Sequence, residues 1–229
     1  MDKFLVIGHR GAAGCAPENT LLALERCMRQ GAHALEFDVQ LHPSGQLFLL
    51  HDLTLDRTTS GRGLAGKMPW EKLRKLDAGQ GQQIPTLDEA LELIDQQAVV
   101  NVELKTWNGT GGAVARVLRE HLADGWPAAQ FLVSSFHLPE LFEFKQAAPE
   151  IPIGVLTCGV PLDWAAVATE LGAQALNISA EFVDERLVDD AHKRGVKVYV
   201  YTVNRADEIA QLKRIGVDGA FTDFPERFF

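Results

Sequence analysis

Short apolar runs alternate with longer segments of helical periodicity along most of this 229-residue chain. Uninterrupted apolar runs are typical of parallel strands that are covered on both faces. They predict strands at residues 4–8, 34–39, 99–104, 131–135, 153–157, 175–178, 196–202 and 218–222. Apolar residues at helical spacing predict helices at about 18–30, 112–123, 137–147, 162–170, 184–194 and 205–214, with another after residue 85.

The eight strands and their intervening helices predict an α/β fold, a (β/α)8 barrel of the TIM type. The alternative is an open doubly wound sheet, which shows the same alternation. In its dinucleotide-binding form that sheet has a glycine-rich turn after the first strand, and the residues after Gly8 do not form one. We therefore favour the closed barrel.

One apolar run does not fit the parallel pattern. Residues 46–51 follow the second strand after only a short turn. A parallel crossover needs about a dozen residues, so this run should return antiparallel and form an extra β-hairpin. We expect Leu41 to face Gln46 across the turn. His51 would then lie opposite Glu36.

Residues 52–85 interrupt the alternation with several glycines and one short helical piece near 70–76. They hold too few apolar residues for us to expect a separate core. We therefore expect a single domain over residues 1–229, with 52–85 as a loop-rich insertion. Next, Thr86 and Glu89 have the spacing of a capping box and predict the start of a helix.

Composition narrows the classes of partner. The formal net charge of −9 argues against nucleic acid or an anionic membrane surface. The three cysteines include no CxxC pair, so neither a disulfide framework nor a zinc ribbon is indicated. No apolar stretch near the N-terminus is long enough to predict a signal peptide, and none in the chain approaches the ~18 residues of a membrane span. We expect a cytoplasmic protein without a stable membrane anchor, and the oligomeric state stays open.

Two predicted strands carry acidic residues on one face. In the second strand, Glu36 and Asp38 alternate with apolar residues and therefore point the same way. In the strand at 99–104, Glu103 and the following Lys105 share one face in the same manner. Because barrel strands end at a common rim, the three carboxylates should converge, which suits one Mg²⁺ or Ca²⁺ ion. The alternative is a buried ion-pair layer in which Arg10 and Lys105 neutralise the acids without a metal.

Two histidines, His9 and His51, end an apolar run beside these acids. Cleavage of a phosphodiester needs a general base and a general acid, and histidine serves both roles near neutral pH. The alternative for each is a structural hydrogen bond to a carboxylate. We expect the other histidines to be solvated in helices, turns or loops: His33, His42, His121, His137 and His192.

Cations and aromatic residues also follow the strand ends. Arg10 and Lys105 could bind a phosphodiester more strongly as it gains negative charge in the transition state, and salt bridges to the acids are compatible with that role. Phe136 and Tyr201 could line a substrate cleft, although aromatic residues at a barrel mouth often serve as packing.

In their order and spacing, these motifs resemble the glycerophosphodiester phosphodiesterases from end to end. The small cytoplasmic bacterial members are the most similar. The matching segments are residues 9–11, 17–20, 36–41, 51–52, 55–59, 85–91, 103–105, 134–136, 201–204 and 222–223. Tyr201 stands where many members of the family have Trp.

The resemblance implies metal-dependent hydrolysis of a small-molecule glycerophosphodiester, such as glycerophosphocholine or glycerophosphoethanolamine, to sn-glycerol 3-phosphate and an alcohol. The neighbouring glycerol hydroxyl would attack phosphorus, and water would open the resulting cyclic phosphate. The residues implied in metal binding are Glu36, Asp38 and Glu103. Those implied in acid–base catalysis are His9 and His51, and those implied in substrate binding are Arg10, Lys105, Phe136, Tyr201 and Asn204.

Two other functions stay open. A lysophospholipase D-type phosphodiesterase would use the same fold on a lipid substrate, but the sequence shows no convincing apolar groove or amphipathic helix near the barrel mouth. A non-catalytic metal-stabilised binding module would bind ligand without turnover. Which histidine is the acid and which the base is also left open.

Overall fold

Eight parallel strands close into a barrel in the computed structural model, which describes residues 4–229. The strands follow the order β1–β9–β8–β7–β6–β5–β4–β2, and pairing of β1 with β2 closes the ring. Their bounds are β1 Leu5–Gly8, β2 Ala34–Leu41, β4 Val99–Leu104, β5 Phe131–Ser135, β6 Ile153–Thr157, β7 Ala175–Ser179, β8 Lys197–Tyr201 and β9 Gly219–Thr222. The predicted (β/α)8 architecture is confirmed.

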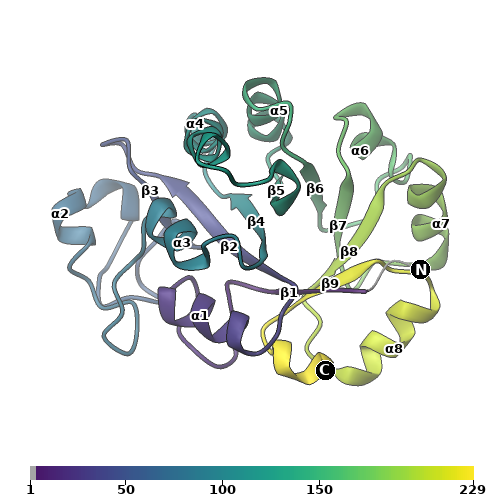
Figure 1. The fold of residues 1–229 in the computed structure, drawn as a ribbon, viewed down its shortest axis with the longest axis horizontal. Helices are drawn as coiled ribbons and strands as arrows, with labels where there is room; N and C mark the ends of the chain where they lie inside the picture. The colour runs from purple at the N-terminus through teal and green to yellow at the C-terminus, as the bar shows by residue number, and fades with distance from the viewer. Residues whose placement is uncertain (1–3) are drawn as a thin grey trace.

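Except for α2, which lies apart with the insertion beyond β3 (Leu47–Leu49), the helices follow one another around the strands in chain order (Figure 1). Their bounds are α1 Leu21–Arg29, α2 Trp70–Leu73, α3 Leu87–Ile94, α4 Thr110–Ala123, α5 Leu138–Ala147, α6 Ala166–Glu170, α7 Glu185–Lys193 and α8 Ala206–Arg214. Short 3₁₀ turns are η1 Ala65–Lys67, η2 Ala128–Gln130 and η3 Pro225–Phe228. The capping box at the start of α3 is formed as predicted, by Thr86 and Glu89. No helix within residues 4–229 is long and apolar enough to cross a membrane.

The alternation along β2 separates the core from the site. Leu35, Phe37 and Val39 have no exposed surface and pack in the large apolar cluster between the strands and the helices. Glu36 and Asp38 point to the other side, into the barrel, and are almost as deeply buried. The alternation thus packs apolar side chains of β2 against the surrounding helices, which stabilises the strand, and turns its acidic side chains into the barrel.

The extra hairpin forms as expected, with one difference. Strand β3 (Leu47–Leu49) pairs antiparallel with the end of β2. Leu41 pairs with Leu47 and not with Gln46, so the predicted register was wrong by one residue. The chain still returns along β2, and His51, two residues after the end of β3, lines one cavity with Glu36 and Glu103.

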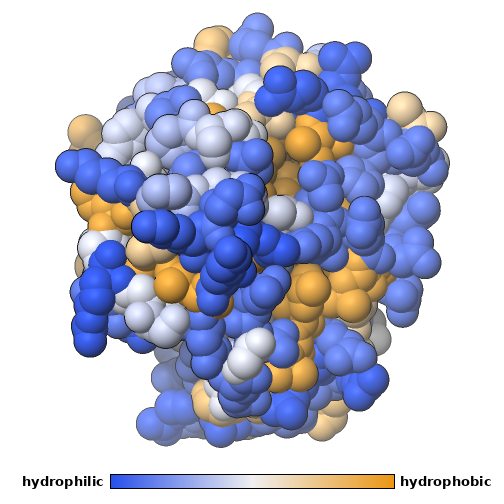
Figure 2. Space-filling view, turned by 90° about the vertical axis from the view of Figure 1, so that its left-hand side faces the viewer, coloured by the Kyte–Doolittle hydropathy of each residue, from blue (hydrophilic) through white to orange (hydrophobic). Residues whose placement is uncertain are grey.

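The insertion packs more tightly than the sequence suggested. Residues between β3 and α3 form a small apolar cluster, in which Leu55 and Leu73 have no exposed surface, against Phe48 and Leu50. The cluster is shared with the β3 hairpin, and the insertion's part of it is spread over irregular turns, where no periodicity reveals it. The insertion and α2 lie on the side of the molecule seen in Figure 2, where hydrophilic residues predominate and apolar ones show between them.

Candidate active site

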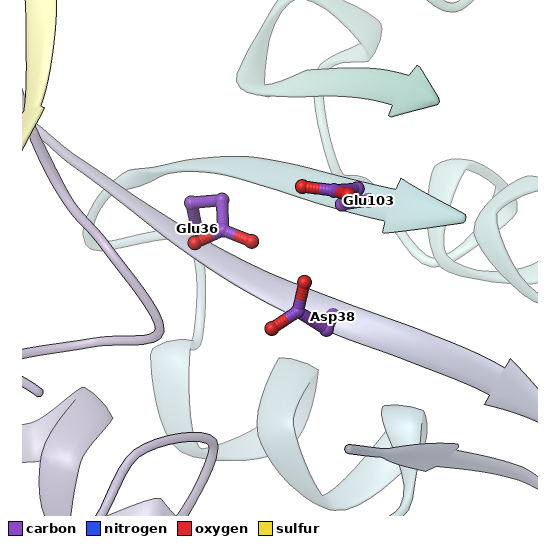
Figure 3. Close-up of side chains that lie close together, drawn as sticks. All are labelled: Glu36, Asp38 and Glu103. Carbon is purple, nitrogen blue, oxygen red and sulfur yellow. The ribbon is translucent and has the colours of Figure 1, made fainter. Parts of the chain in front are cut away.

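Three carboxylates gather inside the barrel on two adjacent strands. Glu36 and Asp38 come from β2 and Glu103 from β4, where Asp38 and Glu103 are partners in the strand register. One oxygen from each lies within 4.8 Å of the others, and Figure 3 shows the three side chains turned toward a common space. All three residues are buried. The convergence predicted from the alternation of the two strands is confirmed.

Burial and mutual repulsion shape the acidity of the cluster. Burial raises the pKa of Glu36 well above its usual value, and the charges of Asp38 and Glu103 raise it further. Burial also raises the pKa of Glu103, to about 7. Burial opposes ionisation of Asp38 as well, but the cations Lys105 and Arg10 outweigh it and lower its pKa. Asp38 is therefore the member of the cluster whose ionised form is most favoured.

The two cations Lys105 and Arg10 form ion pairs with some of these acids and not with others. Lys105 Nζ lies 3.1 Å from Asp38 Oδ1 and also contacts Glu103, and Arg10 Nε lies 3.4 Å from Asp38 Oδ2. Neither side chain forms an ion pair with Glu36 in the described residues. Its Oε2 accepts a hydrogen bond from the Arg10 backbone N–H at 2.7 Å. Its Oε1 is buried and has no hydrogen-bond partner within residues 4–229.

This arrangement bears on the two sequence interpretations of the acids and is more easily reconciled with a bound cation than with an ion-pair layer. An ion-pair layer without metal would leave each buried oxygen paired, because an unpaired buried carboxylate oxygen is costly. Here three carboxylates face two cations, and Glu36 Oε1 has no partner in the part of the chain described. Such an oxygen set is the donor type that Mg²⁺ and Ca²⁺ prefer. The residues therefore fit a divalent cation.

A tight turn after β1 places the Arg10 backbone against Glu36. Arg10 has a left-handed φ of 52°, and Gly11 follows with a φ of 78°. A Cβ on Gly11 would lie 2.6 Å from the backbone carbon of Ala23, so only glycine fits between this turn and α1. The turn thus aims one N–H at the acid and leaves the Arg10 side chain free to reach Asp38.

The two candidate histidines are each held by a carboxylate. His9 Nδ1 lies 2.7 Å from Asp223 Oδ1, and His51 Nδ1 lies 2.7 Å from Asp52 Oδ1. A carboxylate on Nδ1 favours the tautomer with its proton there, which leaves Nε2 of the ring for chemistry. Burial lowers the pKa of His51 below its usual value. Both rings are thereby oriented.

The two histidines meet the acids across one cavity of about 150 Å³. Its polar lining is His9, Arg10, Glu36, His51, Glu103, Lys105 and Thr202, and its apolar lining is Phe136, Leu156, Tyr201 and Phe221. A cavity of this size, lined by cations, acids and aromatic rings, suits a small polar ligand with a short carbon chain. Of the predicted site residues, the structure brings all but Asp38 and Asn204 to its surface; Asp38 lies just beneath.

Asn204 has a different place from the one expected. Its Nδ2 donates to Asp223 Oδ2 at 2.7 Å, and its Oδ1 accepts from the Asp223 backbone N–H at 2.9 Å. The Asn204 amide is therefore hydrogen-bonded to Asp223, the partner of His9, and Asn204 does not line the cavity.

Several supporting residues were not among the predicted site residues. Asn19 donates to Asp38 Oδ2 at 2.7 Å and accepts from the Asp38 backbone N–H at 3.0 Å. Asp223 and Asp52 hold the histidines. All three lie in turns, where no periodicity marks them; only their membership in the family-like segments could have suggested a role.

The view that the other histidines are solvated was wrong for His42, which is 5% exposed. Its Nε2 lies 2.9 Å from the Met68 carbonyl oxygen, and its ring packs against Phe48 and Trp70. The insertion covers the hairpin turn and buries this ring, which the local sequence alone does not reveal.

The chain is similar to known proteins over nearly its whole length. The sequence model of the glycerophosphoryl diester phosphodiesterase family matches residues 9–227. A glycerophosphodiester phosphodiesterase of Caldanaerobacter subterraneus subsp. tengcongensis is 37% identical over 237 residues, covering 98% of this chain and 96% of that protein. A Bacillus altitudinis protein of the same name is 34% identical, with 97% and 95% covered.

Solved structures show the same likeness. An Oleispira antarctica phosphodiesterase in complex with the product sn-glycerol-3-phosphate has a TM-score of 0.90 and 36% identity, with 97% of this chain and 94% of that chain covered. A glycerophosphodiester phosphodiesterase from Agrobacterium tumefaciens has a TM-score of 0.83 and 29% identity, with 99% of each chain covered.

Proposed function

Because this chain belongs to the glycerophosphoryl diester phosphodiesterase family, we propose that it hydrolyses glycerophosphodiesters to sn-glycerol 3-phosphate and an alcohol. The observation that carries the proposal is the shared cavity. Two of the three clustered carboxylates, Glu36 with its unpaired oxygen and Glu103, line it together with two carboxylate-backed histidines. The relatives' names and the sn-glycerol-3-phosphate held by the Oleispira antarctica structure support this substrate class.

Glu36, Asp38 and Glu103 would hold one divalent cation, Mg²⁺ or Ca²⁺. When bound, the cation supplies positive charge for a phosphoryl oxygen as negative charge builds up on it. The buried unpaired Oε1 of Glu36 supports this assignment. Asn19 has a positioning role, because its amide fixes the Asp38 carboxylate.

His9 and His51 would move the protons of the reaction. The glycerol 2-hydroxyl attacks phosphorus, and one ring accepts its proton. The other ring protonates the oxygen of the departing alcohol as the P–O bond breaks, which leaves a cyclic phosphate. Water then adds to phosphorus with the two proton roles exchanged, and the ring-opened product is sn-glycerol 3-phosphate.

Arg10 and Lys105 would bind the phosphate. Both line the cavity, and the site's aspartate Asp38 holds both of them by ion pairs. Burial alone would lower the pKa of Lys105, but Asp38 and Glu103 more than compensate, so its pKa is raised and it stays charged. A fixed cation stabilises the transition state more than the singly charged substrate.

Phe136 and Tyr201 would form the apolar wall for the carbon chain of the substrate. Their rings lie edge to face with centroids 5.9 Å apart, and both line the cavity. The Tyr201 hydroxyl donates to the Thr157 carbonyl oxygen at 2.7 Å, which points it away from chemistry. Asn204, behind Asp223, would act by positioning that carboxylate rather than by touching substrate.

Metal binding should weaken as the solution becomes more acidic. Glu103 has a pKa of about 7 and that of Glu36 is also raised, so at lower pH the cluster holds protons that a cation must displace. We expect Mg²⁺ affinity to fall by at least tenfold between a pH of about 8 and about 5.5. Isothermal titration calorimetry in two buffers of different ionisation heat measures the affinity and the released protons together. An affinity independent of pH would contradict the raised pKa values.

One observation favours a second candidate, a lysophospholipase D-type activity. Large apolar side chains are exposed in the loops after β4 to β7: Trp107 is 62% exposed, Leu162 96%, Phe182 48% and Phe136 43%. The sequence had suggested no apolar surface there. These loops follow the strand ends at the barrel mouth, where a lipid chain outside the small cavity could lie against them.

A substrate comparison separates the two candidates. We expect kcat/KM for glycerophosphocholine to exceed that for lysophosphatidylcholine by at least about tenfold, because the cavity holds little more than the glycerol phosphate. Release of choline from both substrates, measured below the critical micelle concentration of the lipid, gives the ratio. A ratio in favour of the lipid would assign the lysophospholipase D-type function instead. We also propose, from the sequence, that the protein acts in the cytoplasm.

A further inference from the structure

Arg57, a residue of the insertion, binds two carboxylates at once. On one edge of its guanidinium, Nε donates to Asp52 Oδ2 at 2.7 Å and Nη2 donates to Asp52 Oδ1 at 3.0 Å. On the other edge, Nη1 donates to Glu18 Oε2 at 2.7 Å and Nη2 donates to Glu18 Oε1 at 2.9 Å. Paired hydrogen bonds of this kind fix both distance and direction.

Each of these carboxylates holds a group that lines the cavity. Asp52 Oδ1 lies 2.7 Å from His51 Nδ1, and Glu18 Oε1 accepts from Arg10 Nη1 at 2.7 Å. His51 and Arg10 line the cavity, whereas Arg57 does not. Through these two carboxylates, the Arg57 side chain is therefore linked both to His51, a candidate proton carrier, and to Arg10, a candidate phosphate-binding cation.

The backbone around Arg57 is anchored on the insertion's apolar cluster. Leu55 has no exposed surface, and its backbone N–H donates to the Gly63 carbonyl at 2.9 Å. Thr59 caps the same turn, with its N–H and its hydroxyl both donating to the Leu55 carbonyl, at 3.1 and 2.8 Å. The position of Arg57 is thus set by a packed turn rather than by a loose loop.

The charges show why both carboxylates need Arg57. Hydrogen bonds from Arg57 are the main cause that lowers the pKa of Asp52. Burial would raise the pKa of Glu18, but hydrogen bonds from Arg57 and the charge of Arg10 lower it. Without Arg57, these two carboxylates would keep only His51 and Arg10 as side-chain partners among the described residues. Arg10 would then be drawn toward Glu18, away from Asp38.

We propose that Arg57 is a positioning residue that fixes the His51 ring and the Arg10 guanidinium together, through Asp52 and Glu18. The inference rests on the proposed function, because it concerns the machinery of that site. The packed turn of the insertion then serves to brace the site. An ordinary surface ion pair of this half-exposed residue would affect stability slightly and turnover not at all.

Kinetics of Arg57 variants test the proposal. We expect Arg57→Ala to lower kcat for glycerophosphocholine by about 10- to 100-fold. Arg57→Lys should recover little of this loss, because an ammonium group cannot bind two carboxylates in paired fashion. Added guanidinium at about 50 mM should partly restore Arg57→Ala, whereas the same concentration of sodium chloride should not. The matched control is Arg62→Ala, an insertion arginine that is 84% exposed and lies 3.6 Å from Asp56.

A substrate-free measurement keeps this test separate from the proposed function. In NMR spectra of isotope-labelled histidine, Arg57→Ala should shift or broaden the His51 ring signals, assigned by their loss in His51→Ala. The Arg62→Ala spectrum should match that of the unchanged protein. Unaltered His51 signals in Arg57→Ala, or a kcat within about twofold of the unchanged protein, would overturn the positioning role. Absence of turnover in the unchanged protein would refute the proposed function alone, since the NMR readout needs no substrate.

Discussion

Replacing either His9 or His51 by alanine is expected to lower turnover of glycerophosphocholine by about 10²- to 10⁴-fold without loss of the fold. Both rings line the cavity, and a carboxylate holds Nδ1 of each at 2.7 Å. The substitution removes either the group that accepts the hydroxyl proton or the group that protonates the departing alcohol. Release of sn-glycerol 3-phosphate at saturating substrate measures the loss, and thermal unfolding followed by circular dichroism measures the fold.

The control for this experiment is a histidine with a similar carboxylate partner far from the chemistry. His192 on α7 lies 2.9 Å from Asp218 Oδ2 and does not line the cavity. His192→Ala should retain turnover within about twofold, as expected for a surface substitution. Full activity in His9→Ala or in His51→Ala would remove that ring from the mechanism. Ligand binding without any turnover in the unchanged protein would favour the non-catalytic binding module.

The acid cluster could be predicted because two strands show the same alternation of apolar and polar residues. Alternation fixes the parity of side chains in a strand, and the carboxyl ends of parallel strands meet at one rim. Glu36, Asp38 and Glu103 therefore had to converge once β2 and β4 were recognised as neighbours. The same reasoning located Lys105, which the structure places 3.1 Å from Asp38.

The residues that support the site were harder to predict, because they lie in turns. Asn19, Asp52 and Asp223 act through hydrogen bonds to partners that are distant in the sequence or fixed by turn geometry. No period marks such positions, and their partners are known only once the chain has folded. The substrate contact expected for Asn204 is not seen for the same reason, because its amide is hydrogen-bonded to Asp223.

Errors in the hairpin and the insertion have related causes. The pairing of Leu41 with Leu47 depends on the exact form of the turn, which the sequence leaves uncertain by a residue. The burial of His42 and Leu55 depends on how the insertion folds over β3. Both are tertiary effects, to which local patterns of polarity are insensitive.

Removal of divalent metal should have an effect at least as large as the loss of a histidine. A bound cation would let three buried carboxylates, one with an unpaired oxygen, accept a phosphate close by without repulsion. Glu36→Gln keeps the shape of the side chain but removes one charge from the cluster. We expect it to lower Mg²⁺ affinity by at least about tenfold and turnover by about 10²- to 10³-fold.

The matched control is Glu140→Gln, a change at another buried glutamate. Glu140 accepts hydrogen bonds from the Gly109 and Gly111 backbone N–H groups, at 2.9 and 2.7 Å, and lies outside the cluster. This variant should bind Mg²⁺ like the unchanged protein even where its unfolding temperature falls. Thermal stabilisation by added Mg²⁺, compared between the two variants, separates metal binding from general stability.

The most direct test of the central claim is release of sn-glycerol 3-phosphate from glycerophosphocholine by chelator-treated protein, before and after addition of Mg²⁺ or Ca²⁺. We expect activity to fall to background with chelator, to return with one of the two ions, and not to return in Glu36→Gln. Full activity of the chelated protein, or restoration of Glu36→Gln to the level of the unchanged protein, would contradict a metal-dependent phosphodiesterase site built on Glu36, Asp38 and Glu103.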